Sequence, residues 1–415
     1  MEESAIGRVS AEGAPSPLPE GWQQQWPAFR GPNGDGICAF ADIPQAWDET
    51  AGTGILWKVA VPLPGLSSPV VWNGRIYLSG ATRERRALFC YKAENGELVW
   101  QRECPADTAA GNDYPAYDLT GIHAAPTPVV DGQRVTALFA NGQVLSCDAV
   151  TGDVRWTKFL GVPENSYGIA NSLLRWRGNV LIRFDSDPAR LLALDAATGA
   201  QMWDRRIQES GWCSPILAQT APGAWQVIVQ GSPDLAAYDP DDGRSLWYTE
   251  LCSGDVAPTP VFARGLVLAA FQGNGLFAVK PDGKGDVSAD KIAWRVTELE
   301  SGMFPDCVGP VSDGERVYFF SNVLVCTDLA SGKVLYEQTL KDASGNDDET
   351  AYASPCFAGG RLMFFGKRTT YLVEPGPTCQ VVGRCPMNEG LNASPAFAPG
   401  RIFLRGPQHL YAIGH

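Results

Sequence analysis

Apolar and polar positions along this chain alternate in short runs, and one pattern of thirteen residues recurs. In "LLALDAATGAQMW" (residues 191–203) an apolar run leads into an aspartate, a Thr-Gly turn and a second short run that ends on tryptophan. Glycine supplies the positive φ that a tight turn needs, and aspartate can hydrogen-bond the turn backbone. The pattern therefore predicts a β-hairpin. Related copies occupy residues 88–100, 144–156, 235–247 and 323–336, and a stretched copy occupies residues 276–294.

A second hairpin pattern precedes each of these units. "SSPVVWNGRIYLSG" (residues 67–80) contains a strand that begins at a proline, an Asn-Gly turn and an alternating strand. Related segments begin at residues 125, 171, 213, 257, 308, 353 and 393. Two hairpins give four antiparallel strands, and a period of roughly 40–55 residues is typical of propeller blades.

The repeats predict an all-β fold, an eight-bladed β-propeller of four-stranded antiparallel blades. The last copy ends after three strands, whereas "ILWKVAVPL" (residues 55–63) has no hairpin before it. We expect this segment to be the closing strand, so that N- and C-terminal strands share one blade and leave no free edge.

An aromatic residue recurs at the end of the second hairpin. We expect this set to pack between neighbouring blades rather than to stack on a cofactor. Its members are Trp57, Trp100, Trp156, Trp203, Trp247, Trp294 and Tyr336. The seventh blade has Val381 and Val382 near that place, and we expect its packing to be the loosest.

Charge and hydropathy restrict location and partners. With 33 basic and 46 acidic residues the net charge is −13, so nucleic acid is not an expected partner. No apolar run reaches the roughly 18–20 residues of a membrane span, and no signal-like apolar region is visible at the N-terminus. We expect residues 1–25 to form a flexible leader and residues 26–415 to form one propeller that acts as a monomer.

The eleven cysteines do not indicate a metal site, because there is no CxxC and no compact Cys/His cluster. Cys90, Cys147 and Cys326 are interpreted as occupying one equivalent strand position in three repeats, which predicts small buried apolar side chains. Cys379 and Cys385 would be able to bridge a hairpin in an oxidising compartment.

The form "ALDAATGAQMW" resembles the pyrroloquinoline-quinone (PQQ) type of propeller repeat, found in quinoprotein alcohol dehydrogenases and in the outer-membrane assembly factor BamB. The opening "WPAFRGPNGDG" (residues 26–36), with "GKGDVSADKIAW" (283–294) and "HLYAIG" (409–414), is similar to secreted BamB-like repeat proteins of planctomycetes and their relatives. This resemblance implies an exported protein of the periplasm or cell envelope, with a cytoplasmic location as the alternative. It also implies a non-catalytic scaffold that binds a protein, a peptide or a glycan.

The alternative function is an enzyme, either a quinoprotein-type dehydrogenase or a saccharide-acting enzyme with its site at the mouth of the central channel. Quinoproteins resemble one another in a disulfide between adjacent cysteines beneath the cofactor, and no two cysteines here are adjacent. Their calcium ligands find no residue-by-residue match either. We therefore expect no cofactor, no metal and no catalytic residue; PQQ with calcium is what the enzyme alternative would require.

Ligands of propellers usually meet the connections that lead into the inner strands, at one mouth of the channel. Two such connections are long, residues 101–123 and 340–352, and long loops on a minimal scaffold are often functional. The acidic run at residues 347–349 lacks the spacing of an EF-hand loop. The candidate ligand-binding residues at this mouth are Arg30, Tyr117, His123, Tyr167, Asn171, Trp212, Asp255, Asp306, Tyr352 and Asn392.

Two of these candidates have competing interpretations. His123 is either a structural histidine, which we favour, or a catalytic base. The segment "WPAFRGPNGDG" is either a plug, in which Trp26 and Phe29 pack on the propeller, or a device that presents Arg30 to a carboxylate. We favour the plug. A cluster of acidic residues and histidine in the channel would indicate an enzyme, whereas a channel filled by apolar side chains would indicate a scaffold.

Overall fold

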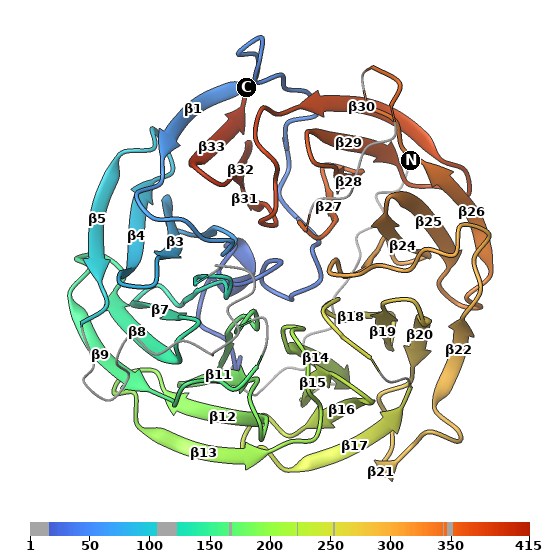
Figure 1. Cartoon of the computed structure of the whole chain (residues 1–415), viewed down its shortest axis with the longest axis horizontal. Helices are drawn as coiled ribbons and strands as arrows, with labels where there is room; N and C mark the ends of the chain where they lie inside the picture. The colour runs from blue at the N-terminus through green and yellow to red at the C-terminus, as the bar shows by residue number, and fades with distance from the viewer. Residues whose placement is uncertain are drawn as a thin grey trace.

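The computed structural model describes residues 16–105, 123–165, 168–221, 223–251, 254–342, 344–346 and 352–415. Within these residues the strands form eight sheets, which are arranged as blades around a central axis (Figure 1). Each blade has four antiparallel strands, ordered from the axis outward. The predicted eight-bladed propeller is confirmed.

Blades 1 to 8 follow the chain order, and their strands are given from the inner to the outer strand. Blade 1 contains β2 (Val70–Trp72), β3 (Arg75–Ala81), β4 (Arg86–Lys92) and β5 (Leu98–Glu103), and blade 2 contains β6 (Val129–Val130), β7 (Arg134–Leu138), β8 (Gln143–Asp148) and β9 (Val154–Phe159). Blade 3 contains β10 (Leu174–Trp176), β11 (Asn179–Phe184), β12 (Arg190–Asp195) and β13 (Gln201–Arg206), and blade 4 contains β14 (Ile216–Ala221), β15 (Ala224–Gln230), β16 (Asp234–Tyr238) and β17 (Ser245–Glu250). Blade 5 contains β18 (Val261–Ala263), β19 (Leu266–Phe271), β20 (Gly275–Val279) and β22 (Ile292–Val296), and blade 6 contains β23 (Val311–Ser312), β24 (Arg316–Ser321), β25 (Val323–Asp328) and β26 (Val334–Thr339). Blade 7 contains β27 (Cys356–Ala358), β28 (Arg361–Phe365), β29 (Thr369–Glu374) and β30 (Gln380–Pro386), and blade 8 contains β31 (Ala396–Ala398), β32 (Arg401–Arg405), β33 (His409–Gly414) and β1 (Ile55–Ala60).

The two ends of the propeller meet in blade 8, as predicted. The N-terminal strand β1 pairs antiparallel with the C-terminal strand β33, so that Lys58 lies opposite Tyr411 and Ala60 lies opposite His409. The observed strand ends at Ala60, three residues before the end of the predicted segment. The pairing closes the ring without a free strand edge between the first and last blades.

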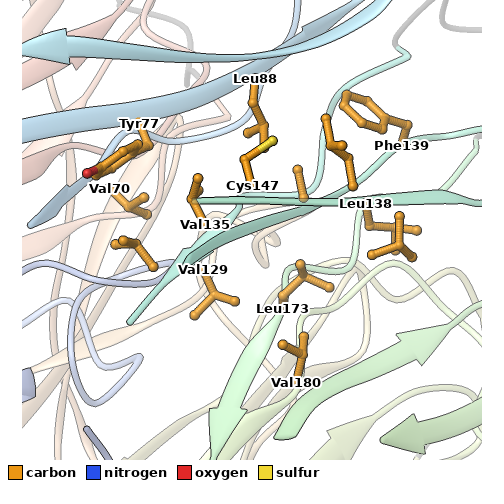
Figure 2. Packing of buried hydrophobic residues seen from close by; sticks show 14 of the residues in the cluster. Val70, Tyr77, Leu88, Val129, Val135, Leu138, Phe139, Cys147, Leu173 and Val180 are labelled. Atoms are coloured by element: carbon orange, nitrogen blue, oxygen red, sulfur yellow. The ribbon is translucent and has the colours of Figure 1, made fainter. Parts of the chain in front are cut away.

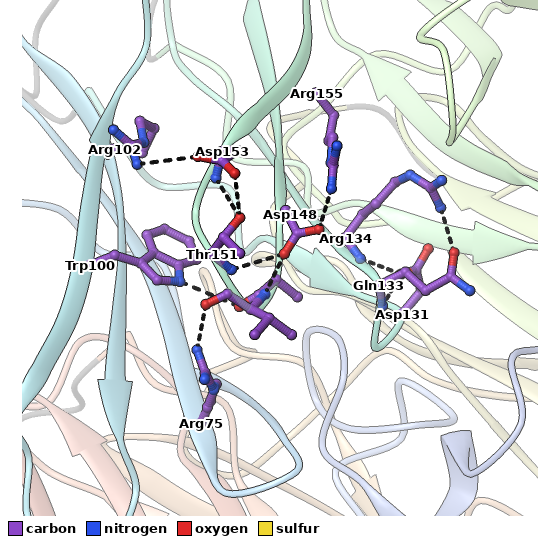
Figure 3. A network of polar contacts seen from close by, with 12 residues as sticks. Arg75, Trp100, Arg102, Asp131, Gln133, Arg134, Asp148, Thr151, Asp153 and Arg155 are labelled. Atoms are coloured by element: carbon purple, nitrogen blue, oxygen red, sulfur yellow. Dashed lines mark hydrogen bonds and ion pairs between the residues drawn. The ribbon is translucent and has the colours of Figure 1, made fainter.

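The turn of the repeated hairpin forms for the reasons that the sequence suggests. In blade 2, Asp148 Oδ1 accepts hydrogen bonds from the amides of Val150 (2.8 Å) and Thr151 (2.9 Å), and the φ of Gly152 is 75° (Figure 3). Arg155 pairs with the other oxygen of the Asp148 carboxylate at 2.5 Å. These hydrogen bonds hold the pKa of Asp148 below its ordinary value, at about 2.

Each hairpin glycine also receives the tryptophan of the preceding blade. A Cβ built on Gly152 would lie 2.6 Å from Cδ2 of Trp100, and the indole of Trp100 donates to the Ala149 carbonyl at 3.3 Å (Figure 3). The same pairing of tryptophan with glycine joins Trp57 to Gly96, Trp156 to Gly199, Trp203 to Gly243 and Trp294 to Gly332. We call this contact the tryptophan–glycine lock; five of the seven aromatic residues that were expected to pack between blades take part in it.

The lock is replaced at three of the eight junctions. Between blades 6 and 7, Tyr336 packs in the layer between the blades, but a Cβ on Gly376 of the blade 7 hairpin would meet only the Thr378 carbonyl within 4 Å. The stretched repeat of blade 5 places β21 (Gly285–Asp286) parallel to β17, with Gly285 opposite Trp247, so a fifth strand rather than a hairpin glycine covers this tryptophan. In blade 7 the register position of the aromatic residue, opposite Leu372, is occupied by Gly383, whereas the side chain of Val382 is 54% exposed. The outer strand of blade 7 therefore has no aromatic residue at this position, although Phe365 of β28 packs in the layer shared with blade 8.

Apolar side chains fill the spaces between neighbouring blades. Figure 2 shows one such layer, in which Leu88 and Tyr77 of blade 1 meet Val135 and Cys147 of blade 2. Nearly all of these side chains are fully buried. The core is thus a ring of inter-blade layers, since each blade has two apolar faces and must bury both.

The segment that precedes β1 crosses the centre of the ring (Figure 1, blue). Its backbone bonds to the inner strands of blades 1 and 2 through Trp26 and Pro27, and its Gly36 and Cys38 bond to β27 of blade 7. The indole ring of Trp26 meets the ring of Phe397 of blade 8 edge-on, with centroids 4.8 Å apart. Contacts of this segment begin before Trp26, because the Pro17 carbonyl accepts the amide of Arg177 in blade 3 at 2.6 Å.

The cysteine predictions need two corrections. Cys90 and Cys326 lie opposite the aromatic residue of their hairpins, but Cys147 lies opposite Val154, one position farther along, and so faces the other side of its blade. All three are buried, because both faces are covered. Cys379 and Cys385 are free; Cys379 directly precedes strand β30 and Cys385 lies near its other end, about 20 Å away at strand rise, so they cannot bridge.

Among the described residues, no helix has the length and apolar character to span a membrane.

Candidate functional site

The predicted mouth residues that the structure describes lie where connections enter the inner strands. Asp255, Asp306 and Tyr352 are exposed, Trp212 and Asn392 are half-buried, and His123 and Asn171 are buried. Tyr117, Tyr167 and the acidic run at residues 347–349 lie outside the described residues.

Four of these residues connect neighbouring blades around the mouth. The Asn171 side-chain amide donates to the Cys213 carbonyl at 2.7 Å, and the Trp212 amide donates to the Val256 carbonyl at 2.8 Å. The Tyr352 amide donates to the Asn392 side chain at 3.3 Å. Each of these three contacts joins one blade to the next, so the four residues lie along a rim rather than around one point.

A second set of inter-blade contacts lies just inside this rim. In six blades, the residue before the proline of the inner strand, or before Leu173 in blade 3, donates its backbone amide to a serine or threonine hydroxyl of the following blade. The donor–acceptor pairs are Ser68–Thr127, Thr127–Ser172, Ser172–Ser214, Ser214–Thr259, Gly309–Ser354 and Ser354–Ser394. Only blade 6 places a glycine, Gly309, in this series.

Arg30 fills the space that this glycine leaves. A Cβ on Gly309 would lie 2.7 Å from Nη1 of Arg30. Nη2 of Arg30 donates to the carbonyls of Pro310 (2.6 Å), Pro355 (3.3 Å) and Asp35 (3.3 Å), and the side chain is 2% exposed. Burial lowers the pKa of this guanidinium to about 10. The side chain is thus directed at backbone carbonyls of blades 6 and 7 rather than at solvent in the mouth.

Two further buried arginines join neighbouring blades in the same way. Arg183 on β11 donates to the carbonyls of Cys213 (3.0 Å) and Gln230 (2.7 Å) in blade 4. Arg405 on β32 donates to the carbonyls of Ser67 (2.9 Å) and Ser79 (2.8 Å) in blade 1. We call these two residues the arginine clamps.

The clamp between blades 3 and 4 is surrounded by carboxyl groups. The carboxylate of Asp185 lies 4.0 Å from Arg183 and accepts the amide of Gly211 at 3.0 Å. The hydroxyl of Tyr238 donates to Glu209 at 2.6 Å. Burial raises the pKa of both Asp185 and Glu209, and it outweighs the opposing effects of Arg183 and of the hydrogen bonds.

A large hollow lies elsewhere, on the face formed by the turns between first and second strands. It is a groove with a volume of about 1070 Å³ across blades 4, 5 and 6. Its walls are the β14–β15, β18–β19 and β23–β24 turns together with the connection that follows β20. That connection, residues 280–291, replaces the tight hairpin of the other repeats, and the groove occupies the space beside it.

Charged side chains line this groove unevenly. Arg316 is paired with Asp313 (3.1 Å) and Glu315 (3.0 Å), and Asp282 is paired with Lys291 (3.1 Å). In contrast, Arg264 and Lys280 have no carboxylate partner among the residues that the structure describes. The lining thus carries three cations and three carboxylates, and two of its cations, Arg264 and Lys280, lack a carboxylate partner in the described ranges.

Sequence reasoning missed the hydroxyl series, the arginine clamps and the groove. The hydroxyl series had a visible signal, because serine or threonine precedes most of the prolines that open the inner strands. The groove had one too, since "LFAVKPDGKGDVSADKIAW" departs in length from every other copy of the hairpin. The clamps had none, because arginine stands at this position in only two blades.

Comparison with known proteins matches this architecture to one family. The family model described as "Outer membrane protein assembly factor BamB" matches residues 41–212 and 188–286, more than half of the chain together. Outer membrane protein assembly factor BamB of Burkholderia pseudomallei is 23% identical over 297 residues, which is 63% of this chain and 71% of that protein. The corresponding protein of Yersinia pestis is 24% identical over 240 residues, 56% of each chain.

Solved structures resemble the chain in fold. BamB from Moraxella catarrhalis superimposes with a TM-score of 0.62 at 13% identity, over 87% of this chain and 97% of that one. A europium-containing methanol dehydrogenase gives 0.71 at 11% identity, over 95% and 98%. A quinohemoprotein alcohol dehydrogenase from Comamonas testosteroni gives 0.68 at 13% identity, over 95% and 81%. At such identities the likeness concerns the propeller fold alone.

Proposed function

Because the chain belongs to the family of the outer membrane protein assembly factor BamB, we propose that it is a non-catalytic propeller scaffold that binds a protein partner in the cell envelope. The proposal includes export from the cytoplasm, because the relatives' name assigns them to outer-membrane assembly. Propellers without a central site recognise partners through exposed turns or through addition of an extended strand.

The observation that carries the proposal is the chain's own segment in the centre of the ring. Trp26 is 2% exposed and packs on Phe397, and Arg30 is held by the carbonyls of blades 6 and 7. The clamps and hydroxyls around this segment contact protein groups of neighbouring blades. These contacts support a structural role for the centre and leave the outer faces for recognition.

The enzyme alternative requires a quinone on the axis together with a calcium ion. The residues of this chain do not fit that group, since Trp26 and Arg30 are already packed at the centre and the cysteines beneath a quinone would have to be adjacent. Within the described ranges, no group of three or more His, Cys, Asp or Glu side chains is placed to hold a metal ion. No catalytic step through a quinone follows from these residues.

Cross-linking in the native envelope tests the proposal. The full chain, carrying an affinity tag, is expressed in its source cells, cross-linked, and purified under denaturing conditions for mass spectrometry. We expect one envelope protein to be recovered in a fixed ratio to the chain, and not with an unrelated eight-bladed propeller of similar net charge. Recovery of no envelope protein, with the chain located in the cytoplasm, would contradict the proposal.

A further inference from the structure

We propose that the groove across blades 4 to 6 binds an extended acidic peptide segment of the partner, with Arg264 and Lys280 as the residues that receive its carboxylates. This inference rests on the proposed function, because it assigns a surface and a chemistry to the same partner. It concerns a site remote from the mouth at which the ligand-binding residues were expected.

The chain itself shows how a turn on this face can hold an extended segment. In blade 3 the turn between β10 and β11 begins with Arg177 at φ 48°. The amide of Arg177 donates to the Pro17 carbonyl of the crossing N-terminal segment at 2.6 Å, while its guanidinium pairs with Asp241 at 3.1 Å. One turn residue thus binds a peptide carbonyl of the segment and a carboxylate of the neighbouring blade 4.

Arg264 occupies the equivalent position in blade 5. It is the first residue of the turn between β18 and β19, its φ is 49°, and glycine follows it, as glycine follows Arg177. A left-handed backbone is unfavourable for arginine. Arg177 offsets this cost with its two contacts, whereas the described part of the chain supplies neither a carbonyl to the Arg264 amide nor a carboxylate to its guanidinium. An extended acidic segment would supply both partners, a carbonyl for the Arg264 amide and a carboxylate for its guanidinium.

The groove beside Arg264 has the size and lining for such a segment. Its volume is about 1070 Å³, and Leu266, Pro281 and Leu329 give it an apolar part between the charged residues. Arg264 and Lys280 come from two different walls, the β18–β19 turn and the connection after β20. In a peptide with alternating acidic and apolar side chains, the acidic side chains would therefore contact the two cations and the apolar side chains would contact the apolar part of the groove.

The partners of the charged groups favour an acidic peptide over a basic one. Each carboxylate of the lining already has a contact: Asp282 with Lys291, Glu315 with Arg316, and Asp328 with the Ser331 amide (2.8 Å) and hydroxyl. Arg264 and Lys280 have no carboxylate partner among the described residues. A basic peptide would have to compete with the groups that already contact these carboxylates, whereas an acidic one supplies carboxylates to two cations that lack them.

A fluorescent peptide measures this directly. The probe is a labelled peptide of about ten residues that alternates glutamate with valine, about 33 Å when extended, and binding to the full chain is followed by anisotropy. We expect saturable binding that weakens with added salt, and a loss of at least about tenfold in affinity in the double variant Arg264→Asn, Lys280→Glu. Asparagine tolerates the turn, because Asn73 takes the equivalent position in blade 1 at φ 46°.

Three controls make the result decisive. The variant Arg206→Glu reverses an exposed charge on the outer strand of blade 3, outside the groove, and should leave affinity unchanged. A probe with glutamine in place of glutamate should bind weakly to every variant. Equal affinity of the wild type and the double variant, or equal binding of the glutamine probe, would overturn the proposal, as would preferential binding of the acidic polysaccharide alginate.

Failure of this inference is separable from failure of the proposed function. The cross-linking experiment is repeated with the double variant. If the wild-type chain recovers an envelope protein and the double variant recovers it equally, the groove assignment is wrong and the scaffold function stands. If the wild-type chain recovers none, the proposed function itself fails.

Discussion

At Gly152 the backbone must satisfy two demands at once. Its φ of 75° lies in the left-handed region, and the indole of Trp100 lies where a Cβ would be, 2.6 Å from Cδ2. Gly74 has a similar φ, 72°, but open space around it. The two glycines therefore separate the cost of the conformation from the cost of losing the tryptophan–glycine lock.

We predict that Gly152→Ala destabilises the protein more than Gly74→Ala does. The conformational cost, about 1–2 kcal/mol, applies to both. At Gly152 the added methyl also forces Trp100 away from blade 2, which adds an overpacking cost of about 1–3 kcal/mol. The free energies of unfolding in urea measure the difference, and equal values for the two variants would show that the lock carries no specific packing.

Buried carboxyl groups beside the clamp make stability depend on pH. Burial raises the pKa of Glu209 above its ordinary value, which the unfolded chain retains. The folded state therefore binds more protons between these two pKa values, and its stability is greatest below the unfolded pKa and falls as the pH rises through the folded one. Asp185 acts in the same direction.

We predict that Glu209→Gln removes part of this dependence. Glutamine keeps an acceptor for the hydroxyl of Tyr238 without ionising. Relative to wild type, the variant should gain stability as the pH rises from about 4 to 7, measured as the free energy of unfolding at several pH values. At the surface, Glu97→Gln should show a small change of opposite sign, because Lys92 lowers the pKa of Glu97. A difference between variant and wild type that does not change with pH would refute the assignment.

At the scale of elements, the junction of blades 7 and 8 is held differently from the others. Gly383 stands in place of the aromatic residue, and the chain before β1 packs there instead. Glu49 Oε1 accepts from Lys58 of β1 (2.9 Å) and from Tyr411 of β33 (3.2 Å), and its other oxygen accepts from the Asn388 amide (2.7 Å). This carboxylate joins the closing strand, its neighbour and the connection after blade 7.

We predict that Glu49→Ala weakens ring closure. Removing a nearly buried carboxylate leaves the Asn388 amide and the Tyr411 hydroxyl without their acceptor, a cost of about 1–3 kcal/mol. Amide hydrogen exchange in β1 should rise before exchange in β12 does. Glu97→Ala, which breaks an exposed pair with Lys92, is the matched control and should change stability much less than Glu49→Ala does. If both variants exchange alike, Glu49 does not secure the closing strand.

The blades and the closing strand were predictable because their signals are local. A hairpin needs an Asp, a glycine and alternating apolar residues within thirteen positions, and these features repeat. The replacement of the lock in blade 7 was only half visible, because Val381 and Val382 marked the absence of an aromatic residue but not the pairing of Gly383 with Leu372. The register shift in this hairpin also occurs in the other repeats, so the position of Gly383 depends on which residues of the two strands pair, and one segment of sequence does not encode that pairing.

The candidate site was harder to predict for the same reason. Arg30 bonds to the carbonyl of Pro310, 280 residues away, and no periodic pattern connects them. The mouth residues were chosen from topology, and the structure places the described ones on a common rim without bringing them together at one point. The groove lies beside a stretched repeat whose length was visible in the sequence. Whether a hollow forms there depends on how blades 4, 5 and 6 pack together, which the sequence does not show.

At the scale of the whole molecule, the account rests on the centre of the ring. The segment from Pro17 to Cys38 contacts blades 1, 2, 3, 6, 7 and 8, so it ties together parts of the propeller that are far apart in sequence. A propeller that packs its own chain there has the outer faces available for a partner, and the stretched repeat of blade 5 shapes one of them.

Thermal unfolding in the presence of PQQ, with and without calcium, tests this account most directly. A ligand that binds only the folded state raises the free energy of unfolding by about 2.7 kcal/mol at 100 times its Kd. Because the chain's own side chains occupy the centre, the account predicts an unchanged midpoint at every PQQ concentration. A saturable, calcium-dependent rise of the midpoint would contradict it and would place a quinone site in the ring.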